Sequence, residues 1–127
     1  MPDSRNSRDW FLYAEDDFQY ALEGLEAHPR GACQLLAQAC EKYLKASILH
    51  SGVPAPRTHD LVALLELLPT PPPTPSLERS AELIAQAVVP NRYPGNQPEP
   101  TLEEAKAILR AAEVLPDFSR QLLGLIP

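Results

Sequence analysis

The side chains that could do chemistry gather in one stretch of an acidic sequence. Residues 42–59 contain Lys42, Lys45 and Arg57, two of the three histidines and no acid, whereas the 127-residue chain has a net charge of −6. Cations that share one edge of a helix, as Lys42 and Lys45 would, can hold a phosphate group or an acidic surface of a partner. The alternative is that they are solvated surface lysines that balance the negative charge of the acids nearer the N-terminus. The acidic balance argues against non-specific binding of nucleic acid through overall charge.

The sequence PRTHDL, residues 56–61, admits two interpretations. As the start of a helix, Thr58 is a good N-cap and Asp60 in the first turn suits the positive end of the helix dipole. His59 is not explained in this way, because the same dipole disfavours its charged form. His59 and Asp60 cannot form a dyad by themselves, since neighbours on a helix point about 100° apart. His59 is therefore either a site residue or part of a simple cap.

Other catalytic signatures are scarce in the sequence. It has no phosphate-cradling glycine loop, no metal-ligand spacing and no recognisable nucleophile motif. Cys33 and Cys40 lie seven residues apart, too far for a disulfide within one helix, and both fall on the apolar face of their segment. We interpret them as buried, reduced thiols, and we expect neither a metal nor a cofactor.

Helical segments must position these side chains, because apolar residues recur at intervals of three and four along most of the chain. The pattern predicts helices over residues 7–27 (or from residue 4), 29–50, 59–68, 76–89 and from 101 onward, with Ser7 as a plausible N-cap of the first. Thr101 and Glu104 have the spacing of a capping box at the start of the last segment. Pro116 either kinks that helix or separates a final piece, residues 117–125.

These segments predict an all-α fold, since no stretch shows the two-residue alternation of a half-buried strand. We expect an antiparallel up-and-down bundle of four to five helices in a single domain, residues 1–127. The proline-rich stretch 69–75 would be a stiff spacer between helices, and residues 90–100 a loop. In an antiparallel bundle this loop could carry Arg92 to the end that holds His59. Asp17, on the edge of the first apolar stripe, would either reach a partner on another helix or face solvent.

The sequence contains no sign of a membrane segment. No apolar run of about 18 residues or more occurs, and the N-terminal residues MPDSRNSRDW show no apolar region of a secretory signal. A cytoplasmic protein is the expectation.

Four short motifs appear in a characteristic order along residues 8–93. They are WFLYAEDDFQYAL in the first helix, QACEKYLKASILHSG in the second, THDLVALL at the turn into the third and NRYP after the fourth. In this order the chain resembles the HEPN family, the small helical domains named for higher-eukaryote and prokaryote nucleotide binding, and in particular its prokaryotic stand-alone members.

The resemblance implies a helical bundle that is often dimeric. It also implies a small nucleotidyltransferase as a partner, frequently in a toxin–antitoxin pair. Several branches of the family are metal-independent ribonucleases that use an arginine, four to six residues and then a histidine. This sequence departs from that motif, because no arginine precedes a histidine by five to seven positions. The most similar spacing is Lys45 followed five positions later by His50, but Lys45 matches an ordinary position of the family's second-helix motif.

The sequence and the resemblance together lead to one main hypothesis. The chain would be a non-enzymatic, dimerising HEPN-like protein that binds a nucleotide or a nucleotidyltransferase partner, with RNA as a further possible ligand. Asp17, Thr58 and Asp60 would be structural polar anchors, with Lys42 or His59 as the partner of Asp17. The alternatives are a divergent ribonuclease toxin and a purely structural helical dimer. The expected ligand-binding residues are Lys42, Lys45, Arg57, His59, Arg92 and Tyr93.

Overall fold

The computed structural model describes residues 2–68, 74–88 and 99–125. It contains helices at every segment that the apolar periodicity predicted, and no strand occurs in these ranges, so the all-α prediction is confirmed. None of the described helices is long and apolar enough to cross a membrane. The helices are α1 (Ser7–Gly24), α2 (Pro29–His50), α3 (Leu61–Glu66), α4 (Pro75–Val88), α5 (Leu102–Ala112) and α6 (Val114–Leu122).

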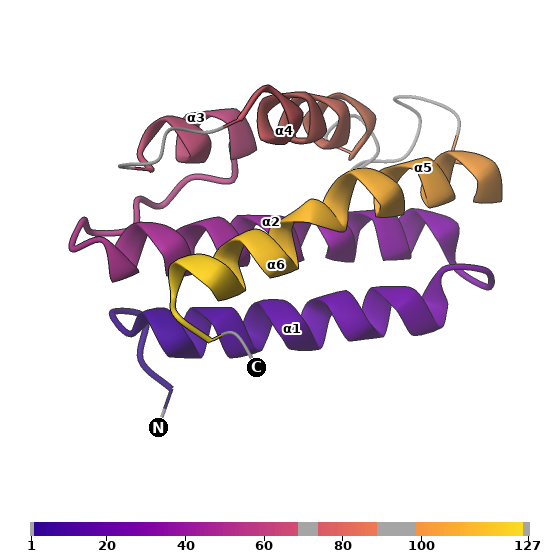
Figure 1. Cartoon of the computed structure of the whole chain (residues 1–127). Coiled ribbons are helices and arrows are strands. Elements are labelled where there is room, and N and C mark those ends of the chain that lie inside the picture. The colour runs from indigo at the N-terminus through magenta and orange to yellow at the C-terminus, as the bar shows by residue number, and fades with distance from the viewer. Residues whose placement is uncertain (1, 69–73, 89–98, 126–127) are drawn as a thin grey trace.

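Helix α2 is the centre of the bundle and packs against each of the other helices. Figure 1 shows α1 and α2 side by side and antiparallel, with α3 and α4 on the far side of α2 from α1. Helices α5 and α6 follow one another along α2 (Figure 1). This arrangement leaves part of one edge of α2 accessible, between residues 30 and 42, and the polar residues of the candidate site lie there.

The helix ends follow local side-chain chemistry. Helix α1 is capped by Asn6, whose Oδ1 accepts a hydrogen bond from the Asp9 N–H at 3.1 Å, and not by the predicted Ser7. Helix α2 keeps its predicted bounds, with Pro29 at its first position. Thr101 and Glu104 form the predicted capping box through bonds of 3.1 and 3.0 Å.

Pro116 explains why the C-terminal segment forms two helices. Proline has no N–H to donate to the carbonyl of Ala112, four residues earlier, and its ring would clash with that carbonyl. Helix α5 accordingly ends at Ala112, and α6 begins at Val114. Of the two predicted outcomes, the helix splits, but the new helix starts before Pro116 and not after it.

The core is built from the inner face of α2. Leu36, Leu44 and Ile48 are essentially fully buried there, and each such side chain contributes about 1.5–3 kcal/mol relative to exposure. Cys33 and Cys40 are free and buried, as predicted. Burial raises the pKa of the Cys40 thiol to about 12 and also raises the pKa of Cys33, so both thiols stay protonated and unreactive near neutral pH.

Polar contacts attach α6 to this core. The buried Ser119 hydroxyl donates to the Tyr43 carbonyl at 3.1 Å and lies 3.1 Å from the Ser47 hydroxyl. Arg120 pairs with Glu15 of α1 at 2.6 Å. Buried polar groups cost free energy unless they are paired, so these contacts restrict how α6 can sit against α1 and α2.

Candidate ligand-binding groove on helix α2

A groove of about 480 Å³ runs along the exposed edge of α2. Six of its lining residues are on α2 and recur at three- and four-residue intervals, the spacing that places side chains on one helix face. The seventh comes from the turn before α3. We call it the α2 groove, and its lining residues are Arg30, Gln34, Ala37, Gln38, Glu41, Lys42 and His59.

Glu41 organises one end of the groove. One of its oxygens accepts a hydrogen bond from Lys45 Nζ at 2.9 Å, and the other lies 2.8 Å from His59 Nδ1. Because a carboxylate only accepts, Nδ1 carries the proton in this contact, and Nε2 is the nitrogen left for another partner. The His59 side chain is 70% exposed whereas Glu41 is nearly buried. A fixed carboxylate therefore orients an imidazole that solvent and ligands can reach.

Lys45 supports this arrangement from inside the protein. Its side chain is buried, does not line the groove, and places Nζ 5.3 Å from the centroid of the Trp10 ring. From its sequence, Lys45 was expected to be a surface cation that contacts a ligand, and the structure corrects this. A buried ammonium needs a partner to offset its lost hydration, and Glu41 provides it.

Lys42 lines the groove and also connects two helices. Its Nζ is paired with Asp17 of α1 and lies 6.0 Å from the centroid of the Tyr13 ring. Of the two partners considered for Asp17, the structure therefore brings Lys42 to it and leaves His59 on Glu41. Each lysine of the predicted basic cluster has an acidic partner, so the groove combines charges of both signs.

The other end of the groove contains Arg30 and Gln34. The side-chain nitrogen of Gln34 donates to the carbonyl of Val88 at 3.0 Å, which links α2 to the end of α4. This contact fixes the amide and leaves its oxygen as the acceptor. Arg30 lies 3.9 Å from Glu99, and both side chains are largely exposed, so this pair is weak.

The residues of the turn PRTHDL have different roles from those predicted. Asp60, not Thr58, is the N-cap of α3, and its carboxylate accepts from Val62 N–H at 3.1 Å and from Ala63 N–H at 3.2 Å. The Thr58 hydroxyl accepts from the Asp60 N–H at 3.1 Å. The backbone is still extended at Asp60, so α3 starts at Leu61 and not at His59. Capping thus accounts for Thr58 and Asp60, and His59 contacts Glu41.

The remaining predicted residues lie away from this cluster or outside the described ranges. Arg57 is exposed and does not line the groove. Arg92 and Tyr93 lie outside the residues that the structure describes. Over those described ranges, no group of three or more His, Cys, Asp or Glu side chains could hold a metal ion.

Five of the seven groove residues were not predicted as ligand contacts, namely Arg30, Gln34, Ala37, Gln38 and Glu41. The spacing of 30, 34, 38, 41 and 42 on one polar edge of a long helix is a signal that could have found them. The contact between Glu41 and His59 has no local signal, since it joins residues 18 positions apart.

The comparisons with known proteins define the family. A model of the HEPN domain matches residues 7–122, from the first residue of α1 to the last of α6. The chain therefore belongs to the HEPN domain family, as the order of its motifs indicated. No curated protein matches the chain significantly.

Two solved structures share the fold. TT1696 from Thermus thermophilus is 28% identical, with a TM-score of 0.81 over 92% of this chain and 98% of that chain. ST0689, an archaeal HEPN homologue, is 22% identical, with a TM-score of 0.75 over 93% of this chain and 98% of that chain. The second likeness shows the fold alone.

Proposed function

We propose that this HEPN protein binds a nucleotide in the α2 groove, either free or held by a nucleotidyltransferase partner, and acts without catalysis. The observation that carries the proposal is the lining of the groove, which combines two cations, an oriented histidine and two glutamines. Phosphate oxygens are bound by ammonium, guanidinium and imidazolium N–H groups, and amide side chains match the edges of bases. A toxin–antitoxin pair is one setting in which such a partner would occur.

The two ends of the groove are suited to different parts of a ligand. Lys42 and His59 lie at one end, where protonated His59 can donate from Nε2 while Glu41 holds Nδ1. Arg30 lies twelve positions before Lys42, a separation of about 18 Å along a helix axis. Gln34 and Gln38 lie between them, so a base read by amides would be flanked by cations on both sides.

Isothermal titration calorimetry with ATP and GTP tests this proposal. We expect His59→Ala and Arg30→Ala each to weaken binding about tenfold, which corresponds to about 1.4 kcal/mol. Arg57→Ala is the matched control, because it removes an exposed cation that does not line the groove. The proposal fails if neither nucleotide binds, or if the groove variants bind as well as the control. Circular dichroism would verify that all variants are folded.

A divergent metal-independent ribonuclease is the second candidate, and the Glu41–His59 contact favours it. A carboxylate that fixes the tautomer of an exposed histidine is an arrangement used in general acid–base catalysis. It predicts RNA cleavage in the presence of EDTA, abolished by His59→Ala and reduced by Glu41→Gln. Intact RNA after incubation with the wild-type protein would remove this candidate and leave the binding proposal standing.

We also propose that the chain forms homodimers, as its family resemblance implies. Helix α1 contributes several of the exposed large apolar side chains, including Leu12 and Tyr20. Such side chains are candidates for burial between two copies. Analytical ultracentrifugation should give a dimer mass that falls to the monomer mass for Tyr20→Glu, whereas a monomer at all concentrations would exclude the dimer.

A further inference from the structure

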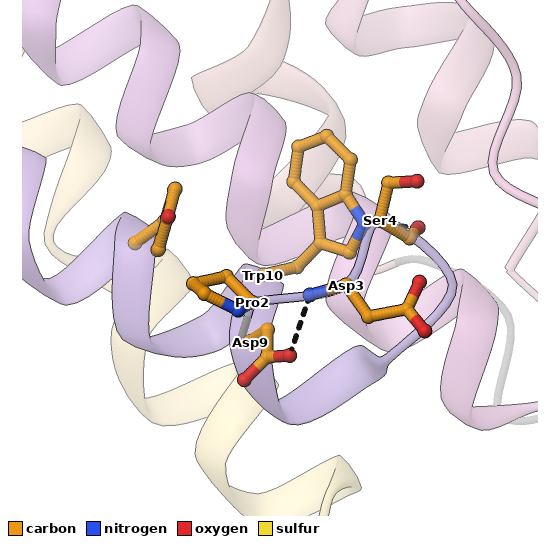
Figure 2. A pocket seen from close by; sticks show the side chains of 6 residues that line it. Pro2, Asp3, Ser4, Asp9 and Trp10 are labelled. Atoms are coloured by element: carbon orange, nitrogen blue, oxygen red, sulfur yellow. Dashed lines mark hydrogen bonds between the residues drawn. The ribbon is translucent and has the colours of Figure 1, made fainter.

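A second pocket, of about 220 Å³, lies where the N-terminal segment folds back over the first turns of α1 (Figure 2). None of its residues lines the α2 groove. We call it the N-terminal pocket, and it is lined by Pro2, Asp3, Ser4, Asp9, Trp10 and Tyr13.

Two hydrogen bonds hold the segment that forms one wall of this pocket. The Asp3 N–H donates to Asp9 at 2.8 Å, as the dashed line in Figure 2 shows. The indole N–H of Trp10 donates to the Ser4 carbonyl at 2.7 Å. The indole proton is thereby satisfied and the ring is fixed, so the pocket is held open by bonds that the protein makes to itself.

Aromatic rings form the other wall. Trp10 and Tyr13 are three residues apart, so they lie on the same face of α1. Each ring already has a lysine Nζ from α2 near it, Lys45 at 5.3 Å from the Trp10 centroid and Lys42 at 6.0 Å from the Tyr13 centroid. Neither lysine lines the pocket, and each has its own acidic partner. The two rings therefore line a pocket whose lining contains neither of these lysines, and aromatic faces attract cations.

Negative charge is the second feature of the pocket. Its charged lining residues are Asp3 and Asp9, and no lysine, arginine or histidine of the described ranges lines it. Asp3 is paired with the exposed side chain of Arg5. Over the described residues, no cation is paired with Asp9, whose carboxylate accepts the Asp3 N–H and keeps capacity for a second donor.

We propose that the N-terminal pocket binds an ammonium or guanidinium group at the end of an apolar chain. The aromatic rings would contact the apolar stem and the cation, and Asp9 would accept its N–H groups. Two sources share this chemistry, a lysine or arginine side chain of a partner protein and a free polyamine. The proposal depends on residues outside the α2 groove, so it stands or falls independently of nucleotide binding.

Trp10 makes the test direct, because it is the only tryptophan in the chain. Its fluorescence would be followed during titration with Nα-acetyl-arginine amide, Nα-acetyl-lysine amide and spermidine. Nα-acetyl-citrulline amide, which has the shape of the arginine compound without its charge, is the matched ligand control. We expect a saturable change with at least one cation and none with the citrulline compound.

The protein controls separate charge from fold. Asp9→Asn keeps an oxygen that can accept the Asp3 N–H but removes the charge, and we expect it to weaken binding about tenfold. Tyr13→Leu should weaken binding about threefold. Asp16→Asn removes an exposed acid of the same helix that does not line the pocket, so it should bind like the wild type. Equal binding by Asp9→Asn and the wild type would overturn the proposal, and so would an equal response to arginine and citrulline compounds.

The relative affinities identify the source of the ligand. Tighter binding of spermidine than of either capped amino acid points to a free polyamine, and the reverse order points to a side chain of a partner protein. Absence of a saturable change with all three cations overturns the proposal. Nucleotide affinity of Asp9→Asn, measured in parallel, should equal that of the wild type because the two sites share no lining residue.

Discussion

Two ion pairs of α2, formed by lysines three residues apart, lie in different surroundings. The side chains of Lys45 and Glu41 are 7% and 12% exposed, whereas those of Lys42 and Asp17 are 23% and 22% exposed. The first pair lies within one helix and supports His59, and the second joins α2 to α1 at the edge of the groove. Burial, and not position in a basic stretch, thus decides which lysine a ligand can reach.

Removal of Lys45 should have the largest effect on stability. Lys45→Ala leaves the nearly buried Glu41 with only His59 as a partner, and breaking a buried pair costs about 3 kcal/mol. Urea denaturation would measure the loss in the free energy of unfolding. The control is Lys106→Ala, which breaks a more exposed i, i+3 pair with Glu103 and should cost less than about 0.5 kcal/mol. Equal effects of the two substitutions would contradict the difference between buried and exposed pairs.

Loss of the α3 cap should come next. Asp60→Ala removes the acceptor for two backbone N–H groups and should cost about 1 kcal/mol. Thr58→Ala removes only the hydroxyl that holds the Asp60 N–H, so thermal denaturation should show a smaller loss. A larger loss of stability for Thr58→Ala than for Asp60→Ala would indicate that Thr58 is the N-cap of α3. Because the turn also carries His59, both variants should loosen its contact with Glu41.

The pair between helices should be weaker than the pair within α2. Lys42→Ala should lower the free energy of unfolding by about 1 kcal/mol or less, because its partner Asp17 is partly exposed and stays hydrated without the lysine. A double-mutant cycle with Asp17→Asn would isolate the interaction from other effects of each substitution. A coupling free energy as large as the whole effect of Lys45→Ala would show that the two pairs do not differ as their exposures indicate.

Much of the fold follows from the sequence, because its determinants are local. The three- and four-residue periodicity located all the helical segments, and the capping box at Thr101 fixed one start within a residue. Competition between neighbouring cap residues was harder to predict, so Asn6 and Asp60 replaced Ser7 and Thr58. The position of the break at Glu113 was also hard to predict, because Pro116 disrupts the hydrogen bond to the carbonyl of Ala112, four residues earlier.

The site was less predictable, because its defining contacts join distant parts of the chain. Positive charge pointed to residues 42–59, of which Lys42 and His59 line the α2 groove, but no local pattern indicates that Lys45 is buried or that Asp17 pairs with Lys42. Those outcomes depend on the rotation of α2 against α1. The family pattern did single out His59, and Glu41, to which the structure brings it, lies in the neighbouring EKYLKA stretch.

His59 should give the smallest change in stability and the clearest separation of roles. It is the exposed end of the Lys45–Glu41–His59 network, and Glu41 keeps its buried partner when the imidazole is removed. His59→Ala should therefore change the free energy of unfolding by less than about 0.5 kcal/mol, in the range of ordinary surface substitutions. A loss comparable to that of Lys45→Ala, without any change in ligand binding, would favour a purely structural role for the network. A small loss of stability together with a large loss of nucleotide binding would instead mean that the buried pair serves to orient the imidazole for a ligand.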